Sequence, residues 1–171
     1  MKKFLLVTLS AIMFLSALFA GSVSGATAKE TKILEFDTMV GVPPLLTGAQ
    51  SQAALRGING GGLPWKLTSA RGELTSSGHL EIEVQGLVFA AGPNTDANTV
   101  ASFQGLVSCV KSDGSFERIL TGPFPATTGP ASLGGGNARI QADLTLPQPC
   151  IAPIIFVTNP AGTSWFAVTG Q

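Results

Sequence analysis

Residues 70–88 read Ala-Arg-Gly-Glu-Leu-Thr-Ser-Ser-Gly-His-Leu-Glu-Ile-Glu-Val-Gln-Gly-Leu-Val, and the second half of this stretch alternates strictly between polar and apolar side chains. The apolar positions are Leu80, Ile82 and Val84, and the polar ones are His79, Glu81, Glu83 and Gln85. Because successive side chains of an extended chain point to opposite faces, this period of two predicts a half-buried strand. Ser76-Ser77-Gly78 before it predicts a three-residue hairpin loop, in which Gly78 adopts the positive φ that such a loop requires. The stretch therefore predicts an antiparallel hairpin whose apolar face needs a cover.

Short strands and turns of the same kind fill the rest of the chain. Asp113-Gly114 and Asn159-Pro160-Ala161-Gly162 have the residue preferences of tight turns between strands. Residues 99–111 are apolar or small on both faces, which is typical of a central strand covered on both sides. About eight strands are predicted, at residues 32–37, 65–74, 79–85, 99–111, 116–121, 138–146, 150–157 and 164–169. The pattern predicts an all-β fold, either an antiparallel β-sandwich of jelly-roll or Ig-like type or a small closed β-barrel.

Prolines and glycines predict irregular structure at three places. Residues 39–54 contain Pro43-Pro44, and residues 122–136 end in a triple glycine, so we expect loops in both. Gly60-Gly61-Gly62 is expected to be a flexible turn, because no Gly-Lys-Ser/Thr follows it and no βαβ unit surrounds it. The alternation of residues 65–74 slips near Ser69-Ala70, which predicts a β-bulge within one strand.

The first 28 residues have the features of a secretory signal peptide. Lys2 and Lys3 precede an apolar run over residues 4–20, and Ala26-Thr27-Ala28 matches the small-residue cleavage pattern. We expect cleavage after Ala26 or Ala28, a single β domain over residues 29–171, and no membrane span after cleavage. The alternative is an uncleaved anchor, because the run is close to the length of a bilayer span. The expected location is secreted or extracytoplasmic, at the cell surface or envelope.

The exported part would hold 143 residues, the size of one domain, with eight basic against ten acidic residues and a formal charge of −2. This balance gives no electrostatic argument for a nucleic-acid partner. The four arginines are dispersed in the sequence and indicate no basic patch; they are Arg56, Arg71, Arg118 and Arg139.

Cys109 and Cys150 are the two cysteines of the chain, and both lie in the exported part. Two cysteines in an oxidising compartment predict one disulfide. It would close a loop of 41 positions, and the chain-entropy model gives such a loop about 4 kcal/mol of stabilisation. The alternative is two separate buried thiols.

Two motifs carry a resemblance: Gly-Ile-Asn-Gly-Gly-Gly-Leu-Pro-Trp at residues 57–65, and Leu-Pro-Gln-Pro-Cys-Ile-Ala-Pro-Ile-Ile-Phe-Val-Thr at residues 146–158. In these residues the exported part resembles a group of secreted bacterial proteins to which no function is assigned. The resemblance implies export from a bacterium and brings no catalytic residues with it.

The candidate metal-binding and catalytic residues lie mainly on the polar face of the hairpin. His79, Glu81 and Glu83 would lie about 6.6–7 Å apart along one strand, and such a row diverges too widely to bind one metal ion. Glu81 and Glu83 have about the spacing of the two carboxylates of an inverting glycosidase, although alternating Glu residues are common on solvated strands. Trp65 and Trp165 are flanked by apolar residues, which favours core packing over ligand stacking. The sequence therefore predicts no catalytic, cofactor-binding or metal-binding residues.

Three hypotheses about function remain. The leading one is a non-enzymatic exported β domain that binds a macromolecule or a surface, or belongs to the cell envelope. The second is a small carbohydrate-active hydrolase that uses Glu81 and Glu83. The third is a small-ligand carrier with an unfilled interior. We expect an internal pocket above roughly 300 Å³ in a carrier, an open groove with both Glu residues in an enzyme, and a flat or convex face in a binding module.

Overall fold

The predicted hairpin is formed by β5 (Ser69–Thr75) and β6 (His79–Gln85), which pair antiparallel with Leu74 opposite Leu80. The loop between them has the predicted three residues. Gly78 has a φ of 96°, and its N–H donates to the carbonyl of Thr75 at 3.0 Å. The computed structural model describes residues 30–44 and 54–170, so the predicted signal peptide, residues 1–28, lies outside the described residues.

The hairpin is the centre of a four-stranded antiparallel sheet in the order β1-β5-β6-β12. Its edge strands are β1 (Lys32–Phe36) and β12 (Ala138–Asp143). The apolar side of β6 faces inward as predicted, because Leu80, Ile82 and Val84 are all at most 1% exposed.

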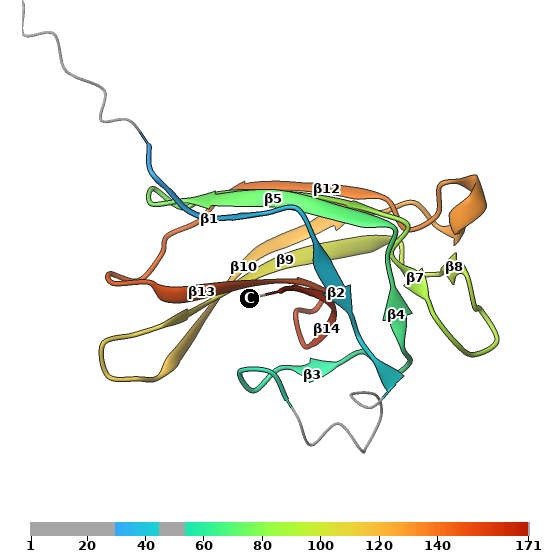
Figure 1. Cartoon of the computed structure of the whole chain (residues 1–171), viewed down its shortest axis with the longest axis horizontal. Coiled ribbons are helices and arrows are strands. Elements are labelled where there is room, and N and C mark those ends of the chain that lie inside the picture. The colour runs from blue at the N-terminus through green and yellow to red at the C-terminus, as the bar shows by residue number, and fades with distance from the viewer. Residues whose placement is uncertain (1–29, 45–53, 171) are drawn as a thin grey trace, which may run out of the picture.

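A six-stranded sheet lies against this inner face. Its main path is β10-β9-β13-β14-β2, and β3 pairs parallel with β14. The strands are β2 (Met39–Gly41), β3 (Asn59–Gly60), β9 (Ser102–Val110), β10 (Phe116–Pro125), β13 (Ile151–Thr158) and β14 (Ser164–Thr169). Figure 1 shows the four-stranded sheet as one layer above β9, β10 and β13, with β2 descending from the end of β1. The layers form a sandwich and not a closed barrel, which selects the first of the two predicted architectures.

The two sheets share one hydrophobic core. Gly105 of β9 lies at their centre, where an added Cβ would be 2.9 Å from Thr121, 3.2 Å from Ile140 and 3.3 Å from Ile82. The absence of a side chain at this position lets the layers approach closely. β9 itself is buried from Phe103 to Cys109 and has strands on both sides, which confirms its predicted central place.

Small elements close one end of the sandwich. β4 (Trp65–Lys66) pairs with β7 (Val88–Phe89), and β8 (Ala97–Asn98) pairs with β11 (Gly129–Pro130), beside a 3-10 turn at Ala131–Leu133. In the described part of the chain, eight of the strands have five residues or more, in agreement with the predicted number.

Three expectations about the connecting segments were wrong. The slip near Ser69-Ala70 is not a bulge in a continuous strand, because the chain leaves the β4–β7 pair at Lys66 and enters another sheet at Ser69. β2 is a strand within residues 39–54, where a loop was expected. β10 continues to Pro125 inside the predicted loop 122–136, because an edge strand tolerates prolines that a central strand does not.

The predicted disulfide joins Cys109 of β9 to Cys150, one residue before β13, with a Cα–Cα distance of 4.9 Å. A disulfide of this kind indicates an oxidising, extracytoplasmic compartment. Within residues 30–44 and 54–170, no helix is long and apolar enough to span a membrane.

Candidate functional site on the four-stranded sheet

The outer face of the four-stranded sheet presents the polar side of β6. A row of three carboxylates crosses three strands, because Glu35 of β1 is opposite Glu73 of β5 and Glu73 is opposite Glu81 of β6. Like charges in directly opposed positions destabilise a sheet. Cations from neighbouring positions offset this repulsion: Lys32 Nζ lies 3.0 Å from Glu35 Oε1 and 2.6 Å from Glu73 Oε2.

The next row has the order Arg71, Glu83, Arg139 across β5, β6 and β12. Arg71 donates to Glu83 Oε2 from Nε at 3.0 Å and from Nη2 at 2.5 Å. Arg139 is directly opposite Glu83 but forms its ion pair diagonally, with Glu81. Each carboxylate of β6 is therefore bound by a different arginine, one from each neighbouring strand.

A hollow of about 800 Å³ lies over these rows and opens to solvent. Its charged lining residues are Glu35, Asp37, Glu73, Glu81, Glu83, Arg71 and Arg139. Carboxylates outnumber guanidinium groups in this lining, so the hollow is negatively charged overall. The side chains of Arg71 and Arg139 are 73% and 65% exposed, so part of each guanidinium remains accessible to a partner.

The hydrolase hypothesis is tested by the protonation of these carboxylates. The hollow does contain both Glu81 and Glu83, which is the arrangement expected of an enzyme. A glycosidase needs one carboxyl group with a raised pKa to protonate the leaving oxygen. The pKa of Glu83 is instead lowered, first by the hydrogen bond from Arg71 and then by that from Gln85. Glu83 is thus held as a carboxylate, and Glu81 is engaged by Arg139.

His79 lies at the end of the same face. Its Nδ1 is 2.7 Å from Asp143 Oδ1 of β12, and this hydrogen bond raises the pKa of His79 against the opposing effect of partial burial. Among the described residues, no three His, Cys, Asp or Glu side chains are grouped closely enough to bind one metal ion. The contacts of His79 are those of an ion pair across two strands.

Trp65 and Trp165 both belong to the core, as predicted. Trp65 is 4% exposed and stacks on Phe166, with ring centroids 4.0 Å apart. Trp165 is 2% exposed, and its indole N–H donates to the carbonyl of Ile58 at 3.1 Å. Neither ring is available to stack on a sugar in the hollow.

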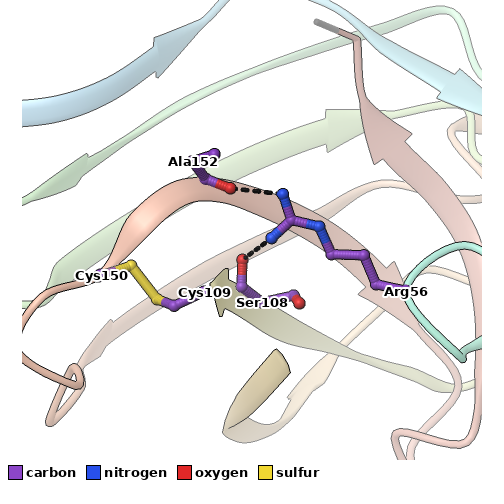
Figure 2. The surroundings of a disulfide bond; sticks show 5 residues. All are labelled: Arg56, Ser108, Cys109, Cys150 and Ala152. Atoms are coloured by element: carbon purple, nitrogen blue, oxygen red, sulfur yellow. Dashed lines mark hydrogen bonds between the residues drawn. A yellow bond between two sulfur atoms is a disulfide. The ribbon is translucent and has the colours of Figure 1, made fainter. Parts of the chain in front are cut away.

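A second cluster surrounds the disulfide between β9 and β13 (Figure 2). Arg56 donates from Nη1 to the carbonyl of Ser108 at 2.8 Å and from Nη2 to the carbonyl of Ala152 at 2.6 Å, so that it joins β9 to β13. Its guanidinium lies 5.3 Å from the ring centroid of Phe116, a cation–π contact. No described carboxylate forms an ion pair with Arg56, whose pKa is lowered by burial.

The second hollow gives no support to the carrier hypothesis. It measures about 490 Å³, is open to solvent, and lies between β4, β7 and the 3-10 turn. Lys66 and Asp96 form an ion pair in its lining, whereas a carrier would enclose an apolar ligand within the sandwich.

The fold and the site define a disulfide-bonded antiparallel β-sandwich with an ion-paired hollow on one outer face. No protein-family model, curated protein or solved structure matches the chain. The resemblance of residues 57–65 and 146–158 to secreted bacterial proteins therefore stays a prediction.

The sequence identified Glu81 and Glu83 but not the arginines that bind them. Arg71 could have been paired with Glu83 by counting outward from the hairpin loop. Arg139 is 58 positions from Glu81, and nothing local indicates that β12 lies beside β6. The role of Arg56 was also missed, because Arg-Gly is not one of the residue pairs that signal a tight turn between strands.

Proposed function

We propose that this chain is an exported, non-enzymatic β-sandwich domain that binds a macromolecule or a surface through the outer face of its four-stranded sheet. The observation that carries the proposal is the hollow over β5 and β6, in which carboxylates and guanidinium groups are fixed in rows on a regular sheet. Side chains held in place by a rigid sheet lose little conformational entropy on binding. Export is supported by the disulfide and by the signal-like residues 1–28.

The charge of the hollow favours a partner with positively charged groups. Complementary charges accelerate association and select the partner, and their effect weakens as salt screens them. Glu35 and Asp37 lie at the β1 side of the hollow, where exposed carboxylates can meet such groups.

The test is a binding screen of the exported protein against arrays of glycans and of peptides with graded net charge. We expect binding to basic members, weakened by added salt and reduced by Glu81→Gln. Glu117→Gln is the matched control, because Glu117 is an exposed carboxylate of β10 outside the hollow. Equal binding by wild type and Glu81→Gln would contradict this assignment of the docking face.

The hydrolase is the second candidate, because the hollow contains both of its proposed carboxylates. Release of reducing sugar from polysaccharides distinguishes the two functions. Hydrolysis by the wild type that disappears in both Glu81→Gln and Glu83→Gln would establish the enzyme and refute the binding domain. The reason to expect no such activity is that Arg71 and Arg139 bind the two carboxylates.

A further inference from the structure

Residues 55–61, called the strap below, consist of a turn whose Arg56 contacts β9 and β13, followed by β3, which pairs with β14. Leu55 and Ile58 close a tight turn through two backbone hydrogen bonds, 3.1 and 3.0 Å long, and both central residues, Arg56 and Gly57, have positive φ. The strap is also bound to β14, since the Gly61 N–H donates to a β14 carbonyl at 2.8 Å. Ile58 is 2% exposed, so the strap buries an apolar side chain against the sheet.

The disulfide lies where the pairing of β9 with β13 is interrupted. The register shifts by one residue, so that Cys109 faces the two residues Ala152 and Pro153. Pro153 has no N–H to contribute to the ladder, and Ala152 has a φ of 44°, so this is a β-bulge. The bond from Cys109 to Cys150 therefore holds β13 against β9 at a point where backbone hydrogen bonds are missing.

Arg56 depends on the spacing that the disulfide fixes. It binds the carbonyl of Ser108, which precedes Cys109, and that of Ala152, two residues after Cys150. A planar guanidinium can reach both carbonyls only while they keep one separation and orientation. Figure 2 shows Arg56 reaching over the two strands beside the disulfide.

We propose that the Cys109–Cys150 disulfide is a redox latch, which keeps the strap closed on the sheet through Arg56 and which a dithiol reductant opens. The reductant thiolate attacks the sulfur of Cys150 because Cys150 is a half-buried residue, whereas Cys109 is fully buried. Cys109 leaves as a thiolate, and the second thiol of the reductant resolves the mixed disulfide. Two electrons pass to the protein, both cysteines take up protons, and the reductant becomes a cyclic disulfide.

Opening of the latch exposes an apolar surface that the oxidised protein covers. Without the cross-link, the bulge of β13 moves away from β9. The guanidinium of Arg56 can then no longer bind the carbonyls of Ser108 and Ala152 together. Leu55 and Ile58 then separate from the sheet, and the indole N–H of Trp165 loses its acceptor. This inference does not depend on what the four-stranded sheet binds.

Hydrogen exchange of the full chain, oxidised and after treatment with dithiothreitol, tests the latch. We expect the amides of Ile58 and Gly61 to exchange about tenfold faster or more after reduction, while those of β6 keep their protection. In oxidised Arg56→Gln the same two amides should already exchange fast. Reduction should then increase their exchange rates only slightly. Arg139→Gln, the same substitution on the other sheet, should leave the strap as protected as in the wild type.

Three results would overturn the latch. Strap amides that stay protected after reduction would show that the disulfide does not control the strap. An equal loss of protection in the strap and in β6 would make the disulfide a cross-link of the whole domain. A strap in Arg56→Gln that responds to reduction as strongly as the wild type would show that Arg56 does not transmit the change.

Discussion

The hydroxyl of Ser108 is a buried polar group that has no hydrogen-bond partner among the described residues. Ser108 lies near the end of β9 and is fully buried, and its backbone carbonyl accepts the hydrogen bond from Arg56. An unsatisfied buried donor costs about 1–3 kcal/mol. Ser108→Ala removes this hydroxyl and leaves the backbone carbonyl that Arg56 binds.

We therefore expect Ser108→Ala to raise the free energy of unfolding by about 1 kcal/mol. Urea unfolding of the oxidised protein measures the change, and Ser102→Ala is the control, at a less buried position of the same strand. A loss of stability in Ser108→Ala would show that the hydroxyl makes a stabilising contact.

The pair of His79 and Asp143 gives the protein a predictable pH dependence. The hydrogen bond to Asp143 raises the folded-state pKa of His79, and the charges of Glu30 and Glu81 act in the same direction. A raised pKa contributes stability that is fully present below the unfolded pKa of histidine and is lost as the pH rises through the folded pKa. The stabilising form is the protonated imidazole beside an ionised carboxylate.

Asp143→Asn should therefore lower the free energy of unfolding most at about pH 5–6, where histidine is protonated. The difference from the wild type should shrink as the pH rises further. Urea unfolding over a pH series measures it. A difference that stays constant with pH would mean that Asp143 acts through packing and not through the charge of His79.

At the scale of the element, the two faces of β6 should respond in opposite ways to substitution. Ile82 is fully buried between the sheets, whereas Glu83 lies in the solvated ion-pair rows. Ile82→Ala should lower the free energy of unfolding by about 2–5 kcal/mol because it leaves a cavity. Glu83→Gln should leave it nearly unchanged, because exposed ion pairs contribute little to stability.

Chemical denaturation of both variants tests this contrast. A shift of one residue in register would exchange the two faces, so a harmless Ile82→Ala would mean that β6 is not placed as described. The like-charge pair of Glu73 and Glu81 gives a further check, since removal of one charge from it should not weaken the sheet.

The elements that sequence reasoning placed well are those with strict alternation or a strong turn signal. β6 and β14 were predicted at their observed bounds, and β12 begins where predicted but ends at Asp143, before the predicted residue 146. The errors occurred where the partner strand, and not the local sequence, decides the structure. β4 ends at Lys66, opposite the first residue of its partner β7, and β10 accepts Pro123 and Pro125 because it is an edge strand.

The candidate site was predictable only in part for the same reason. Alternation alone places Glu81 and Glu83 on one face. The hollow also requires residues of β1 and β12, and the register of distant strands is set by the packing of the two sheets. The positive φ of Arg56 and its reach to two carbonyls are likewise products of tertiary structure.

For the molecule as a whole, the distance between the two sheets depends on Gly105. The nearest atoms to an added Cβ belong to Thr121 of β10, Ile140 of β12 and Ile82 of β6, so a side chain here would push the layers apart. Overpacking of a core costs about 1–3 kcal/mol. Gly105→Ala should lower the free energy of unfolding by this amount.

Gly62→Ala is the matched control for this prediction. An added Cβ at Gly62 meets no atom within 4 Å, and its φ is not positive. Thermal and urea unfolding should therefore show that Gly105→Ala is clearly less stable than Gly62→Ala. Equal stability would indicate that the sheets accommodate a methyl group by a small shift.

The pairing of β2 with β14 joins an early segment of the chain to a late one. Among the described residues, β2 has no other partner strand, and β3 likewise pairs only with β14. Without Ser164–Thr169, neither segment would have the strand that it pairs with. Removal of β14 should therefore also expose the edge of β13, and unpaired strand edges of this kind are sites of aggregation.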